Sequence, residues 1–261
     1  MSINEYLRET ASKLVVSENE KGSIGTSINT LAHRLDLYFG VQIKNKFIFG
    51  SYTRGTILPR KVDDNSDIDY MIVFDNPNDC KPQTFLNKLK NFAEARYSTS
   101  EIYQSSPTIV LELNKIKFEL VPAYYQYGLC YISDGNGGWM YTNPNNFNIS
   151  LMETNKNNKY LIKPIIRLIK YWNIEKNKRF FSSFKIEETI TDQLKYAYLS
   201  CITYTDYLKK AFLSLKDLTY NNDVHERIDK AIDKIQESLE YEKCNLSMTA
   251  LSKIKQIIPE I

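Results

Sequence analysis

Two aspartates stand two positions apart at the head of an apolar segment. Asp67 and Asp69 directly precede Tyr70–Phe74, a continuous apolar run that predicts a strand buried on both faces. Side chains at i and i+2 of a strand project from the same face, so the two carboxylates would lie together. Carboxylates held this close repel each other unless a cation bridges them, and Mg²⁺ prefers oxygen ligands. Two metal ions about 4 Å apart could then serve an in-line phosphoryl transfer, although the triplet alone is equally a polar strand start.

A pair of small residues precedes the aspartates. Lys46–Phe49 is a candidate strand, and it ends at Gly50-Ser51. A glycine at such a junction lets backbone N–H groups approach a phosphate closely, and a serine hydroxyl adds a donor. Gly50 taken alone could equally serve a turn. The order of strand, Gly-Ser, spacer, Asp-x-Asp and apolar strand therefore carries the prediction of a nucleotide phosphate site.

A third carboxylate is needed to complete such a site and to help deprotonate an acceptor hydroxyl. Glu119 is the best candidate, because alternation along its strand places it on one face with Lys117 and Val121. Glu112, in the preceding strand, is the alternative. Either glutamate is equally explained as an exposed strand residue paired with a lysine.

The elements around these residues change in character along the chain. The first forty residues have a helical apolar pattern, and from about Ile149 onward only helical periods occur. Between these regions the pattern predicts one helix, four strands, a hairpin turn and one long loop that is marked by two segments. The helix is Phe85–Tyr97, the strands are Lys46–Phe49, Tyr70–Phe74, Thr108–Leu113 and Ile116–Val121, the turn is Asn114-Lys115, and the loop segments are Asp134–Gly138 and Asn143–Asn146.

Composition narrows the class of protein. The 261 residues are 43% hydrophobic and 25% charged with a net charge of +3, so small polyanions fit as well as long nucleic acid. The four cysteines form no CxxC pair and the two histidines are isolated, so no zinc site is expected. We expect a cytoplasmic protein, because the first residues lack a signal peptide pattern and no run of about 18 apolar residues occurs.

Taken in order, these segments resemble the DNA polymerase β-like nucleotidyltransferase superfamily. Within it the chain is most similar to the bacterial CD-NTases, the cGAS/DncV-like second-messenger synthases of CBASS anti-phage systems. The third acid is Glu119, where many relatives carry aspartate. The similar segments are Gly50-Ser51 with Arg54-Gly55-Thr56, Asp67-Ile68-Asp69, Glu119–Ala123, Gly138-Trp139, Thr142–Pro144, Lys170–Asn173, and Ser183-Phe184 with Glu187.

The resemblance implies a fold and an activity. It implies an α+β protein with a catalytic lobe over residues 1–145, a mixed sheet with flanking helices, and an all-helical lobe over 146–261 that completes the donor-nucleotide site. It implies synthesis of a cyclic di- or oligonucleotide from NTPs with release of pyrophosphate. Mg²⁺, replaceable by Mn²⁺, would be held by Asp67, Asp69 and Glu119, and Lys170 and Ser183 would contact the donor triphosphate. A downstream effector would respond to the diffusible product, with neither a membrane nor a nucleic-acid activator involved.

The helical pattern around Lys170 can be derived independently. Between Lys159 and Asn173 the apolar residues form one face, while Lys163, Arg167 and Lys170 form a basic stripe. Such a stripe would hold phosphates if it faced the carboxylates. It could equally be a solvated basic face, which is the expectation for Lys163 and Arg167.

Two other functions are compatible with the same fold. An RNA-tailing enzyme of the CCA-adding or poly(A) type would need an RNA-binding module, and neither a basic tail nor an aromatic-basic motif occurs. A non-catalytic nucleotide-binding relative would be indicated by the loss of a metal-binding acid. All three acidic positions are occupied, by Asp67, Asp69 and Glu119.

Overall fold

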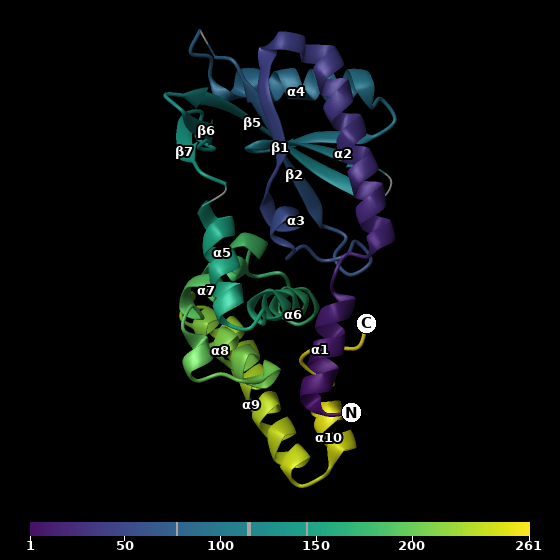
Figure 1. Ribbon diagram of the computed structural model, residues 1–261, viewed down its shortest axis with the longest axis vertical. Helices are drawn as coiled ribbons and strands as arrows, with labels where there is room; N and C mark the ends of the chain where they lie inside the picture. Colours follow the sequence, from purple (N-terminus) through teal and green to yellow (C-terminus); the bar gives the residue numbers. More distant parts are fainter. Residues whose placement is uncertain (77, 114–115, 145) are drawn as a thin grey trace. The chain divides into compact units, whose positions relative to one another are not determined.

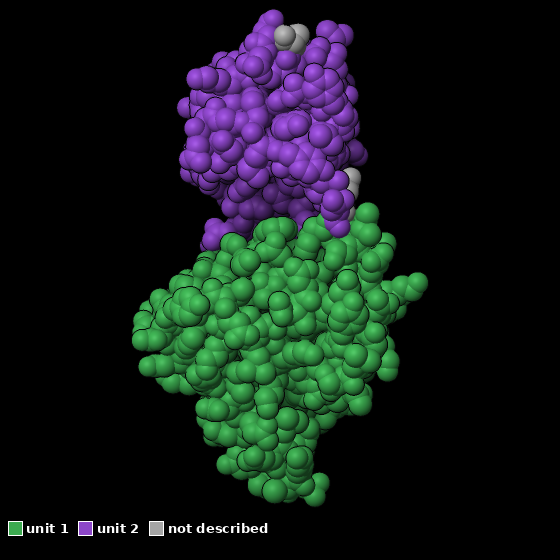
Figure 2. Space-filling view, turned by 90° about the vertical axis from the view of Figure 1, so that its left-hand side faces the viewer, with its two compact units in different colours: residues 1–16, 55–63, 147–261 green, residues 17–54, 64–146 purple. Residues whose placement is uncertain are grey.

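The computed structural model describes residues 1–76, 78–113, 116–144 and 146–261. These residues form two compact units, which Figure 1 shows as ribbons and Figure 2 colours separately. The sheet unit comprises residues 17–54 and 64–146. The helical unit comprises residues 1–16, 55–63 and 147–261. The α+β class expected from the sequence is confirmed.

The described part of the sheet unit contains a seven-stranded mixed sheet. Its order is β1-β2-β5-β4-β3, and β6 pairs with β5 and with β7. Strands β2 and β5 are parallel, and the other pairs are antiparallel. The strands are β1 Ile43–Ile48, β2 Asp67–Phe74, β3 Glu101–Ser105, β4 Thr108–Leu113, β5 Ile116–Gln126, β6 Leu129–Ser133 and β7 Trp139–Thr142. The helical elements are α2 Glu18–Phe39, η1 Gly40–Gln42, α3 Gly50–Arg54 and α4 Pro82–Arg96.

The central strand β2 is buried on both faces, which explains its continuous apolar run. On one face Phe74 stacks on Phe85 of α4, with ring centroids 5.0 Å apart, and meets Phe39 of α2 edge-on at 5.2 Å. On the other face Met71 and Val73 pack in a small apolar cluster with Val121, Ala123 and Cys130. Asp67 and Asp69 precede this cluster on the same face, at the half-buried start of the strand.

The helical unit packs around α6. Of this helix, Ile165, Leu168, Ile169 and Trp172 are buried in one large apolar core. Pro164 lies in the first turn of α6, where a missing N–H breaks no hydrogen bond within the helix. The helical elements are α1 Ile3–Lys13, α5 Asn146–Asn157, α6 Ile162–Glu175, α7 Ser183–Gln193, η2 Ala197–Leu199, α8 Tyr204–Lys216, α9 Asn222–Lys243 and α10 Ser247–Lys255.

The two units divide the chain differently from the expected single boundary after residue 145. Helix α1 belongs to the helical unit, because its buried residues Ile3 and Leu7 join the core around α6. Residues 55–63 also belong to that unit. The expected all-helical character beyond residue 149 agrees with the helices observed there.

Three short strands were not expected from the sequence. Strands β3, β6 and β7 have partly exposed patterns that alternation alone does not mark as strands. Residues 134–138, expected as part of a long loop, form a tight turn between β6 and β7 that is closed by a hydrogen bond from the Asp134 N–H to the Gly138 carbonyl. The predicted hairpin turn Asn114-Lys115, and residue 145 of the predicted loop segment, lie outside the described residues.

No helix in the described ranges combines the length and the apolar character that crossing a membrane requires.

Candidate active site

The register of the sheet places Glu119 beside Asp69. Strands β2 and β5 run parallel and pair Asp69 with Glu119 and Asp67 with Lys117. Directly paired residues share a face, so all three acids lie on one side of the sheet. Glu112 on β4 pairs with Lys117, and β5 therefore separates it from both aspartates. Of the two glutamates considered as a third acid, only Glu119 neighbours the Asp-x-Asp strand.

The Glu119 carboxyl group has a pKa well above its ordinary value. Burial and the negative charge of Asp67 raise its pKa to about 7, although the nearby Lys117 opposes the shift. A hydrogen bond between the Glu119 and Asp67 side chains contributes in the same direction as burial. The Lys117 ammonium lies 3.7 Å from Oδ2 of Asp67. A cation among these carboxylates would favour the ionised form of Glu119.

Gly50 approaches the same carboxylates through its backbone. It begins α3 directly after β1, and it has a φ of +73°. A Cβ at this position would fall 1.7 Å from Oδ2 of Asp69, so any other residue would displace the Asp69 side chain or the backbone. The preceding residue is fixed as well, because the Phe49 N–H donates to the Asp69 carbonyl at 3.0 Å. Ser51 follows in the first turn of α3 and is half-buried. Glycine is therefore required here by close approach as well as by the turn.

The residues of this sheet face suit a divalent metal in donor chemistry. Asp67, Asp69 and Glu119 offer the carboxylate oxygens that Mg²⁺ prefers, and a cation would relieve the repulsion between Asp67 and Glu119 that contributes to the raised pKa of Glu119. Across the described ranges, no group of three or more His, Cys, Asp or Glu side chains forms a ready-made cage for an ion. Mg²⁺ commonly takes one or two carboxylates and completes its shell with water and substrate phosphates, so a cage is not required.

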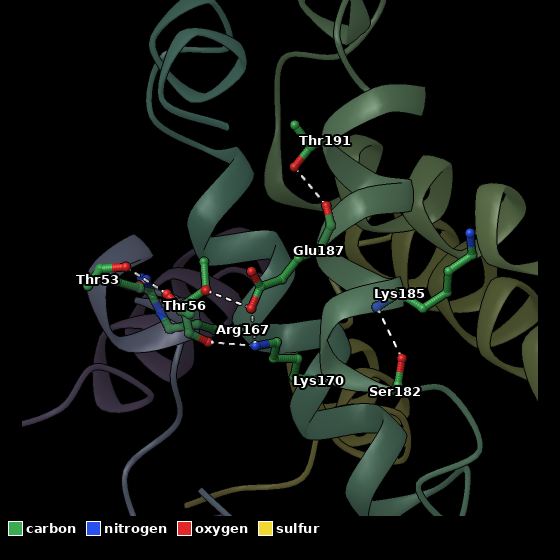
Figure 3. Close-up of polar contacts among 10 residues, drawn as sticks. Thr53, Thr56, Arg167, Lys170, Ser182, Lys185, Glu187 and Thr191 are labelled. Carbon is green, nitrogen blue, oxygen red and sulfur yellow. Dashed lines mark hydrogen bonds and ion pairs between the residues drawn. The ribbon is translucent and has the colours of Figure 1, made fainter. Parts of the chain in front are cut away.

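In the helical unit, Lys170 is buried in an ion pair with Glu187. The two side chains are 4% and 0% exposed. Oε1 of Glu187 also accepts a hydrogen bond from the Thr56 hydroxyl at 2.8 Å, and the Lys170 ammonium donates to the Thr56 carbonyl at 3.2 Å (Figure 3). Removing either partner of a buried pair destabilises the folded protein, because the other charge then remains buried without compensation.

Arg167 binds the adjacent main chain. One of its N–H groups donates to the Gly55 carbonyl at 2.9 Å, and its Nε donates to the Ala11 carbonyl at 3.4 Å. Burial lowers the pKa of Arg167 to about 10. The expectation of a solvated basic face is wrong for Arg167, which is buried among protein carbonyls. Together with Lys170 it holds residues 55 and 56, which directly follow α3 in the chain.

Ser183 lies at the exposed start of α7. It is the first residue of this 11-residue helix, and the preceding Ser182 caps the helix by accepting a hydrogen bond from the Lys185 N–H at 3.2 Å (Figure 3). The N-terminus of a helix favours an anion. The expected site residues thus fall into two groups: Gly50, Ser51, Asp67, Asp69 and Glu119 in the sheet unit, and Lys170 and Ser183 in the helical unit.

Sequence comparison identifies a family and two relatives. Residues 1–155 match the family model of the Second Messenger Oligonucleotide or Dinucleotide Synthetase domain, SMODS. A Bacillus cereus protein that carries the name of a cyclic nucleotide synthase is 34% identical over 105 residues, which is 37% of this chain and 31% of that protein. An Acinetobacter cyclic AMP-AMP-AMP synthase is 24% identical over 191 residues, which is 67% of this chain and 53% of that protein. The chain thus matches between about a third and a half of these relatives' lengths.

Solved structures share the fold over nearly the whole chain. The Vibrio cholerae dinucleotide cyclase DncV, in complex with ATP and GTP, has a TM-score of 0.77 at 10% identity and covers 100% of this chain and 97% of that one. Escherichia coli CdnC with ATP has a TM-score of 0.72 at 16% identity and covers 97% of both chains. With more than half of its residues matching the family model, the chain belongs to the SMODS family of cGAS/DncV-like nucleotidyltransferases.

Proposed function

We propose that this chain makes a cyclic di- or oligonucleotide from NTPs and releases pyrophosphate. The observation that carries the proposal is the grouping of Asp67, Asp69 and Glu119 on one face of β2 and β5, with Gly50 against Asp69, in a chain of the SMODS family. All of these residues lie within one compact unit, and their grouping rests on the sheet register and on the close approach of Gly50 to Asp69.

Each acid has a proposed role. Asp67, Asp69 and Glu119 would hold Mg²⁺, or Mn²⁺ in its place, and the metal would lower the barrier by stabilising charge on the transferring phosphoryl group. Asp67 and Asp69 would bind the metal from the start of β2. Glu119, with a pKa of about 7, is also suited to accept the proton of the attacking hydroxyl, because a base is most effective when its pKa lies near the working pH.

Four residues would contact the donor triphosphate: Gly50, Ser51, Lys170 and Ser183. The close approach of the Gly50 backbone and the half-buried Ser51 hydroxyl support phosphate binding beside the acids. Ser183 is supported by its exposed position at the start of α7. Lys170 would contact a phosphate with the N–H that it does not donate to Glu187 or Thr56, or by exchanging the Glu187 carboxylate for the phosphate. Lys170 therefore combines a proposed phosphate contact with its contact to residue 56.

The names of the relatives support the product class. One relative is named a cyclic AMP-AMP-AMP synthase, and one structure of DncV contains a linear dinucleotide intermediate. We propose that the linear intermediate turns within the same site and presents its remaining hydroxyl to the same acids. The diffusible product would act on a downstream effector in anti-phage signalling, without a nucleic-acid activator. The cytoplasm, with its NTP pool, is the proposed location.

A product assay tests the proposal. The purified full chain is incubated with Mg²⁺ or Mn²⁺ and all four labelled NTPs, and the product is then treated with phosphatase. A closed ring has no terminal phosphate and survives, whereas a linear oligomer loses its 5′ phosphates. We expect a resistant product that is absent with the Asp67→Asn variant. Phosphatase-sensitive product, or synthesis only with added RNA, would instead indicate a tailing enzyme.

A further inference from the structure

A basic pocket lies in the helical unit, among the end of α6, the middle of α9 and the end of α10. Figure 1 labels these three helices. Its volume is about 280 Å³. Four cationic side chains surround an apolar floor, and one amide completes the wall. The cations are Lys176, Arg227, Lys230 and Lys234, the floor is Trp172, Ala231 and Ile257, and the amide is Gln256. All of these residues belong to one compact unit.

The cations of α9 are spaced so that they repel one another. Arg227, Lys230 and Lys234 follow at steps of three and four residues, which places them on one face of the helix. Like charges at these spacings destabilise a helix slightly instead of supporting it. Lys176 adds a fourth positive charge from the residue that follows α6. Positive charges around a concave surface reinforce each other's attraction for anions.

Carboxylates of the protein balance these charges only in part. Lys230 is 3.8 Å from Glu226, and both side chains are largely exposed. Lys234 shares the single carboxylate of Glu237 with Lys253. The Arg227 guanidinium donates to the neutral amide oxygen of Asn177 at 3.3 Å. Within the part of the chain that the structure describes, neither Lys176 nor Arg227 forms an ion pair with a carboxylate.

The charge of the pocket, its apolar floor and its volume together indicate the class of ligand. Phosphates suit the four cations, because Arg and Lys are the side chains that bind them best. A flat apolar group suits the apolar floor, although Trp172, Ala231 and Ile257 are each at most 3% exposed and offer only a small contact area. A volume of about 280 Å³ lies just below the usual range of small-molecule pockets, which favours a single nucleotide over a larger ligand. We propose that this pocket binds a nucleoside phosphate at a second site, independent of the Asp67, Asp69 and Glu119 carboxylates.

The fluorescence of Trp172 offers a local measurement. The chain has two tryptophans, Trp139 in the sheet unit and Trp172 in the pocket floor, so Trp139→Phe leaves Trp172 as the single reporter. The full-length Trp139→Phe protein, with Asp67→Asn and Asp69→Asn added to remove the candidate metal site, is titrated with ATP in excess EDTA. We expect a saturable change in Trp172 emission. Absence of a saturable change would overturn the proposal.

Charge reversal within one helix provides the matched comparison. Lys230→Glu should weaken binding about tenfold or more, since one charge-assisted contact is lost and a repulsion is added. Lys243→Glu makes the same charge change at an exposed position of α9 outside the pocket, and it should leave binding unchanged. Equal weakening by both variants would overturn the pocket in favour of general charge attraction. Lys230→Gln, at an exposed side chain, repeats the test if the charge reversal disturbs folding.

Two further ligands separate the sources of the phosphate. Inorganic triphosphate should bind more weakly than ATP, because it has no base for the apolar floor. Equal binding of the two would contradict a nucleotide site. A cyclic dinucleotide should bind more weakly than ATP at the same ionic strength, because the pocket suits a single nucleotide, and tighter binding of the ring would contradict the proposal. These titrations measure binding and not synthesis. Their outcome therefore does not depend on whether the proposed synthase activity is correct.

Discussion

The backbone of Gly50 lies so close to Asp69 that a Cβ at Gly50 would stand 1.7 Å from the Asp69 carboxylate oxygen. Gly50→Ala must therefore displace Asp69 or α3. We expect a loss of roughly 100-fold in kcat/KM, since a misplacement of about 1 Å at a reacting centre costs that much. Gly55→Ala is the control: Gly55 also has a positive φ, of +68°, but a Cβ there meets nothing within 4 Å. Similar losses in both variants would show that backbone strain, and not Asp69, is the cause.

Removing the charge of either aspartate should abolish pyrophosphate release while the fold is retained. Asp67→Asn and Asp69→Asn keep the shape of half-buried side chains and remove a proposed metal ligand. We expect losses of several orders of magnitude in kcat, with unchanged circular dichroism. Near-wild-type turnover by either variant would exclude the metal-site assignment.

The two glutamates should differ in their effects. Glu119→Gln should be nearly as damaging as the aspartate substitutions, whereas Glu112→Gln should be mild, because β5 separates Glu112 from β2. Pyrophosphate release measured side by side gives the ranking, and the opposite order would assign the third acid to β4. Glu119→Asp shows whether the site accepts the shorter carboxylate of aspartate.

The raised pKa of Glu119 predicts a specific pH dependence of stability. Its folded pKa, about 7, exceeds the ordinary value of 4.5, so the folded protein binds this proton more tightly than the unfolded chain. The resulting stability is fully present below about pH 4.5 and is lost as the pH rises through about 7. Glu119→Gln mimics the protonated group, so its Tm relative to wild type should increase between pH 5 and pH 8 without metal. A pH-independent difference in Tm would contradict the shift.

The Lys170–Glu187 pair makes it possible to separate stability from substrate binding. Lys170→Met should cost about 3–5 kcal/mol of unfolding free energy, because it leaves the Glu187 carboxylate buried and unpaired. Adding Glu187→Gln should restore most of the Tm, since the amide remains an acceptor for the Thr56 hydroxyl. If Lys170 binds the triphosphate, the KM for NTP stays raised in the double variant. Recovery of KM together with Tm would limit Lys170 to positioning residues 55 and 56.

Ser183→Ala is the companion substitution at an exposed position. It should raise the KM for NTP without lowering the Tm, because Ser182, and not Ser183, caps α7. A decrease in kcat with unchanged KM would remove Ser183 from the donor site.

Local patterns predicted the central elements well. The apolar run after Asp69 marked β2 as buried on both faces, and the helical periods placed α6 around Lys170. The choice between Glu119 and Glu112 stayed open, because alternation gives the face of a residue within its own strand and not the neighbouring strand. The parallel pairing of β2 with β5 places Glu119, and not Glu112, beside Asp69, and such pairing is a long-range property.

The partners of the basic stripe could not be predicted for a similar reason. Periodicity identified Arg167 and Lys170 as one stripe of a helix, which suggested either solvent or phosphate as the neighbour. In the structure Arg167 and Lys170 donate hydrogen bonds to the carbonyls of Gly55 and Thr56. These two residues lie more than 100 positions earlier in the sequence. Short-range patterns contain no information on which distant backbone segment returns to a helix face.

The division of the chain between the units has a consequence for synthesis on the ribosome. Helix α1 leaves the ribosome first, but the core that buries Ile3 and Leu7 is built mainly from α6 and the helices after it. At about 5–20 residues per second, α1 precedes α6 by roughly 10 to 30 s. An 11-residue helix is not stable by itself in water, so this segment waits unfolded while the sheet unit completes its strand pairing. The first residues to be made are therefore among the last to fold.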